Sequence, residues 1–183
     1  MDIAHPDAPK VCYSGFLDAS SGMGEAARNI VAALYTSGVD ITTEVIPNIQ
    51  AQIDLGNSYN ITKSLKGRPI EFDFKILHLT PDLVTNYFSP MKYHIFHLFW
   101  ETDRLPKWWV WCLNLCDEIW TGDEHQAEIF KKSGVKKHIW VCPQPIDTSI
   151  TKANPFIIKD HKGFTFYSIF QWIQRKNPRA LIE

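Results

Sequence analysis

The sequence predicts an α/β fold, in which a Rossmann-like parallel sheet has helices on both faces. Short segments rich in β-branched and aromatic residues alternate with amphipathic segments of helical length along most of the chain. A glycine-containing loop also connects the first predicted strand to the first predicted helix. We therefore expect right-handed crossovers and a ligand site at the carboxyl ends of the strands.

The beginning of the chain is predicted to contain two strands joined by a helix. The segment 10–16 (K-V-C-Y-S-G-F) is short and rich in β-branched and aromatic residues, which favours a buried strand. Apolar residues then recur at helical spacing up to Leu34, and Gly38 supplies the left-handed residue that commonly ends a helix. The second strand is predicted at 40–46 and is closed by Pro47.

The middle of the chain is predicted to contain a long loop and two more strands. Residues 47–71 show little periodicity and include several glycines and prolines, so we expect a surface loop with one short helical turn near 61–65. The segment 92–100 (K-Y-H-I-F-H-L-F-W) is almost wholly apolar or aromatic, as in a central strand covered on both faces. The elements expected after the loop are a strand at 72–79, a short helix at 81–88 and a strand at 92–100.

Two helices and two strands are predicted to complete the sheet. The helix at 107–116 follows Pro106 and is apolar almost all round, so we expect it to be largely buried. A helix at 124–132 begins after Asp123, a good N-cap residue, and ends at Gly134. The strands are expected at 117–121 and 138–142.

The chain is predicted to contain one domain and the beginning of a second. Residues 1–147 are expected to form the N-terminal Rossmann-like domain, and the proline- and lysine-bearing segment 148–163 a linker. The segment 164–183 would open a truncated second domain with one strand (F-T-F-Y-S-I-F) and the start of a helix at Asn177-Pro178.

Composition and charge exclude several classes of partner. The formal net charge is −1 and 21% of residues are charged, so no overall field attracts the chain to nucleic acid or to an acidic membrane. The four cysteines lie in or beside apolar runs without a C-x-x-C pair, which predicts buried free thiols and a cytoplasmic location. No apolar run approaches the roughly 20 residues of a membrane-spanning helix, and the N-terminus lacks signal-peptide features.

The loop before the first helix is a candidate binding site. Gly22 and Gly24 remove two side chains where the helix presents its first unpaired N–H groups. Such a helix start attracts anions, and glycine lets a phosphate or a sugar approach the backbone. A plain strand-to-helix turn that uses glycine for its dihedral angles is an equally good interpretation of the loop alone.

Four stretches of the sequence form a pattern that extends over most of the chain outside 47–71. They are S-S-G-M-G-E-A-A-R-N, the run W-E-T-D-R-L-P-K-W-W that leads into D-E-I-W-T-G-D, the segment V-C-P-Q-P-I-D, and F-Q-W-I-Q-R-K-N-P-R-A-L-I-E. In this order and at these separations they resemble the amino-terminal half of a retaining glycosyltransferase of family 4, also called group 1. That family has the two-domain GT-B fold, and the fourth stretch resembles the opening of its donor domain.

The resemblance implies transfer of a sugar from a nucleotide-diphosphate sugar to a hydroxyl of a glycan or lipid-linked acceptor, with retention of configuration. Positioned donors and charges can stabilise the departing diphosphate and the cationic sugar ring without a bound metal or other cofactor. By the resemblance, Gly22 and Gly24 would lie against the donor phosphates or the acceptor. Arg175 and Lys176 would neutralise the diphosphate. For the full-length protein the resemblance allows a weak peripheral membrane contact.

The sequence departs from the family pattern at two places. Phe170-Gln171 stands where many relatives have G-R, so Arg175 must supply that contact or it is missing. Several relatives carry a histidine that points into the site after the third strand, whereas here His78 lies within the strand and Thr80 follows. The resemblance therefore does not assign the catalytic residues.

His97 and Glu101 are the remaining catalytic candidates. His97 lies near the carboxyl end of the fourth predicted strand, and a satisfied structural histidine is the alternative interpretation. Glu101 follows the strand, where a carboxylate can accept hydrogen bonds from sugar hydroxyls; alternatively it pairs with Arg104 or Lys107. The adjacent acidic and histidine residues at 123–125 do not converge on a helix, so no metal site is predicted.

Two other functions fit parts of the sequence. Gly22 to Ala27 matches the G-x-G-x-x-A pattern of dinucleotide-binding oxidoreductases, and Glu44 lies about twenty residues on. Against that function, 17–21 intervene between strand and glycines, and Glu44 lies inside its strand. The chain is alternatively a stand-alone, non-catalytic sugar-binding module.

Overall fold

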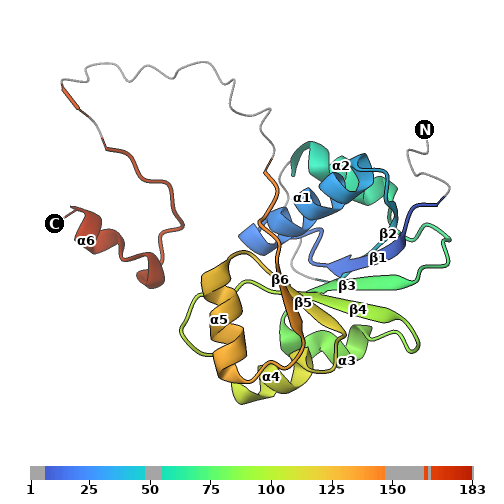
Figure 1. The fold of residues 1–183 in the computed structure, drawn as a ribbon. Helices are drawn as coiled ribbons and strands as arrows, with labels where there is room; N and C mark the ends of the chain where they lie inside the picture. Colours follow the sequence, from blue (N-terminus) through green and yellow to red (C-terminus); the bar gives the residue numbers. More distant parts are fainter. Residues whose placement is uncertain (1–6, 48–54, 147–162, 165, 183) are drawn as a thin grey trace. The chain divides into compact units, whose positions relative to one another are not determined.

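Residues 7–47, 55–146, 163–164 and 166–182 are described by the computed structural model. The chain divides into two compact units, Met1–Asp147 and Thr148–Glu183. The first unit contains a parallel sheet with helices on both faces, so the predicted α/β class with Rossmann-like layers is confirmed (Figure 1).

The six strands of the first unit pair in the order β2-β1-β3-β4-β5-β6, and every pair is parallel. All six were predicted, and the ends of the third and fourth are shorter than expected because their flanking residues lack pairing partners in the ladder. The strands are β1 (Lys10–Gly15), β2 (Asp40–Val45), β3 (Phe74–His78), β4 (Tyr93–His97), β5 (Glu118–Thr121) and β6 (His138–Val141).

Two groups of helices cover the two faces of this sheet (Figure 1). One face packs beneath α1 and α2, around Tyr13 and Val31. The other packs beneath α3, α4 and α5, around Phe96 and Phe130. The helices are α1 (Gly22–Thr36), α2 (Gly56–Ser64), η1 (Pro81–Leu83), α3 (Val84–Tyr87), α4 (Lys107–Leu113) and α5 (Glu124–Ser133).

An isolated parallel bridge between Thr43 and Lys66 extends the sheet beyond β2. The backbone N–H of Thr43 donates to Leu65 O (3.0 Å), and that of Gly67 donates to Thr43 O (3.1 Å). Doubly wound folds place a further strand at this position, next to the strand that leaves the first helix. The chain therefore winds outward in both directions from β1, and the topological switch point lies between β1 and β3.

The α2 helix is longer than the short turn predicted within 47–71. Its sequence, G-N-S-Y-N-I-T-K-S, contains few strong helix formers. Ile61 and Leu65 nevertheless join the core cluster beneath α1. The helix is stabilised by tertiary packing, which local periodicity does not reveal.

The α4 helix is amphipathic rather than buried all round, which corrects the prediction for 107–116. Trp108 and Trp111 stack with ring centroids 4.6 Å apart and are 55% and 47% exposed. Cys112 and Leu113 on the opposite side are fully buried. The helix covers one face of the sheet, so the side that packs against the sheet is buried and the other faces outward. In the described part of the chain, no helix combines the length and apolar character needed to cross a membrane.

The second unit does not contain the strand predicted at 164–170. No strand is found in its described residues, and Phe166, Tyr167 and Ile169 are each at least 85% exposed. A strand requires a neighbouring strand for its hydrogen bonds, and the described part of this unit offers none. The helix predicted to start at Asn177-Pro178 is present as α6 (Pro178–Ile182), after the 3₁₀ turn η3 (Gln174–Lys176).

A line of polar side chains crosses the face of β1–β3 that α1 does not cover. Lys75 is only 4% exposed, and its Nζ lies 2.9 Å from Glu44 Oε2 and 3.1 Å from Ser89 Oγ. Ser14 Oγ donates to the same Glu44 oxygen over 2.6 Å. Burial alone would raise the pKa of Glu44, but the hydrogen bonds from Ser14 and Lys75 bring it below its ordinary value. The carboxylate thus compensates a buried ammonium.

The four cysteines are free thiols, as predicted. Three of them, Cys12, Cys112 and Cys116, are buried, and Cys142 is partly buried. Burial raises the pKa of the Cys116 thiol to about 12, so this side chain stays a neutral, unreactive thiol at ordinary pH.

Replacing Glu44 by Gln should destabilise the first unit more than replacing a surface glutamate. Glu44→Gln leaves the Lys75 ammonium buried without its counter-charge, and we expect a loss of about 1–2 kcal/mol because Glu44 is itself half-exposed. Urea unfolding measures the loss. Glu128→Gln, which breaks only the exposed Lys132 pair on α5, is the matched control and should cost under about 0.5 kcal/mol. Equal losses for the two variants would contradict this account.

Candidate functional site

The glycine loop lies at the carboxyl end of β1, where the sheet's winding reverses. The loop leaves Gly15 and reaches α1 at Gly22, after two tight turns in which Leu17 N donates to Gly15 O (2.9 Å) and Ala19 N to Phe16 O (3.0 Å). Ser21 is the N-cap, and its Oγ accepts from Gly24 N over 3.2 Å. The local sequence S-S-G-M-G therefore encodes a capped helix start.

Gly24 is required by the packing of the loop itself. A Cβ at this position would overlap the carbonyl oxygen of Ala19 and lie 2.9 Å from that of Phe16. The loop backbone thus occupies the space that a side chain at position 24 would need. A Cβ on Gly22, in contrast, would meet nothing within 4 Å. Ligand contact at either glycine stays a prediction, and the packing role of Gly24 is separate from it.

The start of α1 still offers donors to a ligand. Gly22 is exposed and Met23 partly exposed, and in the described residues neither backbone N–H has an acceptor. The N–H of Gly24 is already used by the cap. The first turn of α1 therefore presents two N–H groups, with the positive end of the helix dipole behind them.

Arg28, which the sequence analysis did not identify, holds the loop in place by hydrogen bonds to its backbone. Its side chain is 3% exposed, and its Nη1 donates to Ala19 O (2.6 Å) and Leu17 O (3.1 Å). Burial lowers the pKa of the guanidinium, although it remains a cation at neutral pH. In the sequence, Arg28 is recognisable only as a residue one helical turn after Gly24. Helical periodicity alone does not predict that its side chain contacts the loop.

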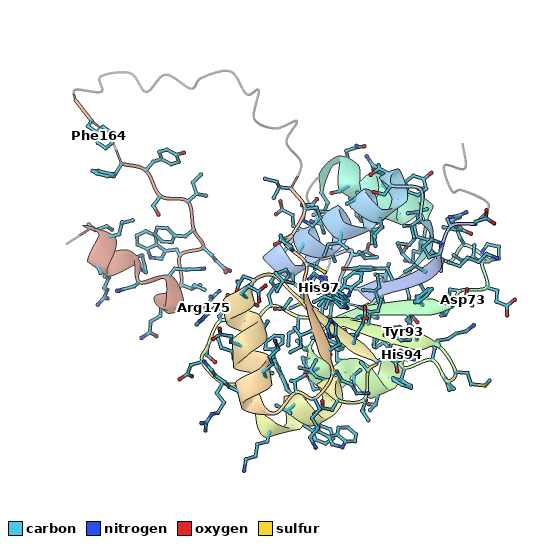
Figure 2. All side chains as sticks on the ribbon, in the orientation of Figure 1. Asp73, Tyr93, His94, His97, Phe164 and Arg175 are labelled. Carbon is cyan, nitrogen blue, oxygen red and sulfur yellow. The ribbon has the colours of Figure 1, made fainter. Side chains whose placement is uncertain are left out.

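His97, the first catalytic candidate, is the last residue of β4 and lies in the interior of the first unit (Figure 2). It is 1% exposed, and neither ring nitrogen has a hydrogen-bond partner in the described residues. The rings of His78 and Phe99 lie 4.6 and 4.8 Å away, centroid to centroid. Burial lowers the pKa of His97 to about 4, so the imidazole is neutral at pH 7.

His78 belongs to the same buried group. Its Nδ1 and the hydroxyl of Tyr13 are 2.6 Å apart, which joins the ends of β1 and β3. Burial, with a smaller contribution from His97, lowers the pKa of His78 well below its ordinary value. Unlike His97, this histidine has a partner, which agrees with the prediction that it lies within the strand rather than beyond its end.

Glu101, the second candidate, lies in the exposed loop that follows β4. The loop is held by its neighbour Trp100, whose backbone N–H donates to Gln126 Oε1 (2.9 Å) and whose indole Nε1 donates to Arg104 O (2.9 Å). Glu101 is therefore carried on a fixed turn at the carboxyl edge of the sheet. The structure gives it the accessibility that His97 lacks.

Gln126 is a further positioning residue that the sequence analysis did not identify. Its Oε1 also accepts from Thr121 Oγ1 (3.1 Å), and its Nε2 donates to Asp123 Oδ2 (2.7 Å). Asp123 caps α5 as predicted, because its Oδ1 accepts from Gln126 N over 2.8 Å. The spacing D-x-x-Q, which resembles a capping box, was the available signal.

The remaining predicted site residues belong to the second unit. Arg175 and Lys176 lie in η3 and are exposed (Figure 2). Gly22 and Gly24 follow β1, whereas His97 ends β4 and Glu101 follows it, so all four lie toward the carboxyl ends of parallel strands. Within the residues that the structure describes, no group of three histidine, cysteine or acidic side chains could hold a metal ion.

Gly24→Ala should destabilise the first unit, whereas Gly22→Ala should not. We expect a cost of about 1–3 kcal/mol at position 24, because a methyl group there must displace the backbone carbonyls of Phe16 and Ala19. Position 22 has open space and should change stability by less than about 0.5 kcal/mol. Urea unfolding of the two variants provides the comparison. A neutral Gly24→Ala would show that the loop is free to move away.

The buried His97 should make stability depend on acidity. The folded-state pKa of His97, about 4, lies below the usual 6.5 of the unfolded chain. Between these values the unfolded state binds a proton that the folded state does not, so the free energy of unfolding falls as the pH drops from 6.5 toward 4. The loss attributable to His97 is on the order of 3 kcal/mol. His97→Leu should flatten this part of the profile, whereas replacing the exposed His125 by Gln should not. Unchanged pH dependence in His97→Leu would contradict the assignment.

Searches of protein families, curated proteins and solved structures returned no match to this chain. The geometry and the motifs of the chain itself are therefore the observations from which a function is inferred.

Proposed function

We propose that this chain is the acceptor-side domain, with the beginning of the donor domain, of a retaining GT-B glycosyltransferase. The full-length protein transfers a sugar from a nucleotide-diphosphate sugar to a glycan or lipid-linked acceptor. The observation that carries the proposal is the position of the glycine loop at the switch point between β1 and β3, where open α/β sheets bind their ligands. The four motif stretches add to it in their order and spacing.

The groups at the carboxyl edge suit the chemistry of sugar transfer. The free N–H groups of Gly22 and Met23 can donate to a phosphate or a sugar hydroxyl, since a helix start favours negative charge. Glu101 is an exposed acceptor for sugar hydroxyls. In the second unit, which is described by itself, Arg175 and Lys176 are exposed cations suited to a departing diphosphate. Positioned donors and charges of this kind lower the barrier without a metal ion.

His97 fits a binding role better than that of a general acid. With a pKa near 4 it is neutral at pH 7, so it can donate one hydrogen bond and accept another but lacks the acidic proton of an imidazolium. Its two unpartnered nitrogens are costly to bury unless something contacts them when the protein is at work. A sugar hydroxyl has both functions that the imidazole needs.

A dinucleotide-binding oxidoreductase is less well supported. In that class an acidic residue at the end of the second strand binds the ribose hydroxyls. Glu44 is instead held by Ser14 and Lys75 on the face of the sheet opposite α1. The loop from Phe16 to Ser21 also separates the glycines from β1, whereas a dinucleotide loop turns directly.

The proposal predicts that the 183-residue chain binds acceptor glycans but does not transfer sugar by itself. Saturation-transfer NMR should detect glycan protons at the chain, and Glu101→Gln should weaken that binding severalfold. Labelled nucleotide sugars should yield no acceptor-dependent product, because the described residues of the second unit contain only η3 and α6 of the proposed donor domain. The full-length protein should form product. Glu128→Gln, which removes the same charge from an exposed side chain of α5, is the charge control.

The outcomes separate the three functions. Tight binding of NAD(P)H in place of glycans would favour the oxidoreductase. Glycan binding without product from the full-length protein, whatever nucleotide sugar is supplied, would favour the non-catalytic module. Robust transfer by the 183-residue chain alone would show that the active site lies elsewhere in the first unit.

A further inference from the structure

A small pocket lies beside the glycine loop, at the carboxyl ends of β1 and β2. Its volume is about 190 Å³. Asp18 from the loop, Tyr59 and Lys63 from α2, and Lys66 from the bridge that extends the sheet contribute to its lining. Drug-sized ligands occupy pockets of about 300–1,000 Å³, so this pocket suits one compact group and not a nucleotide.

Cations outnumber carboxylates around this pocket. The lysine side chains are exposed, and in the described part of the chain neither Lys63 nor Lys66 forms an ion pair. Asp18 is the carboxylate in the lining. Lys63 and Lys66 line the same pocket, and their like charges repel. An anion between them would remove that repulsion.

Arg28 adds a buried cation at the same place. Leu17, whose carbonyl accepts from Arg28 Nη1, lines the pocket. Burial lowers the pKa of the guanidinium, and Glu25, Tyr59 and Asp18 raise it by smaller amounts. Among the described residues, Arg28 Nε is buried without an acceptor and no carboxylate forms an ion pair with the group. The two carbonyls that accept from Arg28 carry no net charge, so a cation stays close to the pocket wall.

We propose that this pocket binds a phosphate group carried by a small molecule or a lipid. Lys63 and Lys66 hold its oxygens from the rim, as point charges that adapt to a tetrahedral anion. The Tyr59 hydroxyl is a further donor, and Arg28 supplies positive potential from beneath the loop. The glycine loop is the wall of this pocket, so an occupied site also fixes the loop. The inference stands on the pocket's charges and does not require sugar transfer.

Binding of phosphate compounds to the whole chain tests the proposal. The probes are inorganic phosphate, glucose 6-phosphate, glucose, and phosphatidylcholine vesicles with and without phosphatidic acid. Calorimetry and vesicle co-sedimentation should show binding of inorganic phosphate, glucose 6-phosphate and vesicles with phosphatidic acid, and not of glucose or pure phosphatidylcholine vesicles, whose phosphate is a diester neutralised by choline. The double variant Lys63→Gln/Lys66→Gln should bind about tenfold or more weakly, and Lys131→Gln/Lys136→Gln, which removes two exposed positive charges elsewhere, less than twofold. Asp18→Asn should tighten binding severalfold.

Each outcome decides a point. Binding of glucose 6-phosphate identifies a soluble phosphate ester, and binding only to phosphatidic acid vesicles identifies a lipid headgroup; both support the pocket. Equal weakening by Lys63→Gln/Lys66→Gln and by Lys131→Gln/Lys136→Gln would reduce the effect to general charge and overturn the proposal. Absence of binding by every phosphate probe would overturn it as well. Circular dichroism of each variant verifies the fold, and the exposed lysines are chosen because their replacement should leave it intact.

Discussion

A glycine at position 24 lets the first turn of α1 lie against the carbonyl groups of Phe16 and Ala19. The loop at the end of β1 can close over the sheet only because that side chain is missing. Arg28 completes the arrangement from the next turn of the helix by donating to Ala19 and Leu17. The position of the helix start, and with it of the free N–H groups of Gly22 and Met23, follows from this contact. A rigid anion-attracting edge is the consequence for the candidate site.

The interior of the same edge contains polar groups that are expensive to bury. Tyr13 and His78 satisfy one another, whereas His97 has no partner in the described residues. Across the sheet, Lys75 is compensated by Glu44 and Ser89. Such groups reduce stability unless every one is paired. The contrast between the paired set and the single unpaired histidine is why His97 remains a candidate for contact with a ligand.

The features that the sequence predicted are those encoded locally. The strands of the first unit are short runs rich in β-branched, aliphatic or aromatic residues, and the cap at Asp123 is predicted from one helical turn. α2 was underestimated because it is held by Ile61 and Leu65 against α1, a contact between distant segments. The strand expected at 164–170 is absent from the described residues because a segment with high β propensity still needs a neighbouring strand to pair with. Arg28 was missed because its acceptors lie on the folded loop before the helix. For Gln126, local spacing indicates the contact with Asp123, whereas its contact with Trp100 is set by the tertiary fold.

Two candidate side chains on one strand and its loop differ in what they can do. His97 is the last residue of β4 and faces the core beneath α1, so its ring is closed off from solvent. Glu101 lies beyond the strand on a turn that Trp100 and Gln126 hold in place. Under the proposed function, a ligand at the carboxyl edge would therefore meet Glu101 and the N–H groups of α1 first. The Phe99 ring lies against both the imidazole of His97 and Gly122, so a ligand contact with His97 would require its buried surroundings to rearrange.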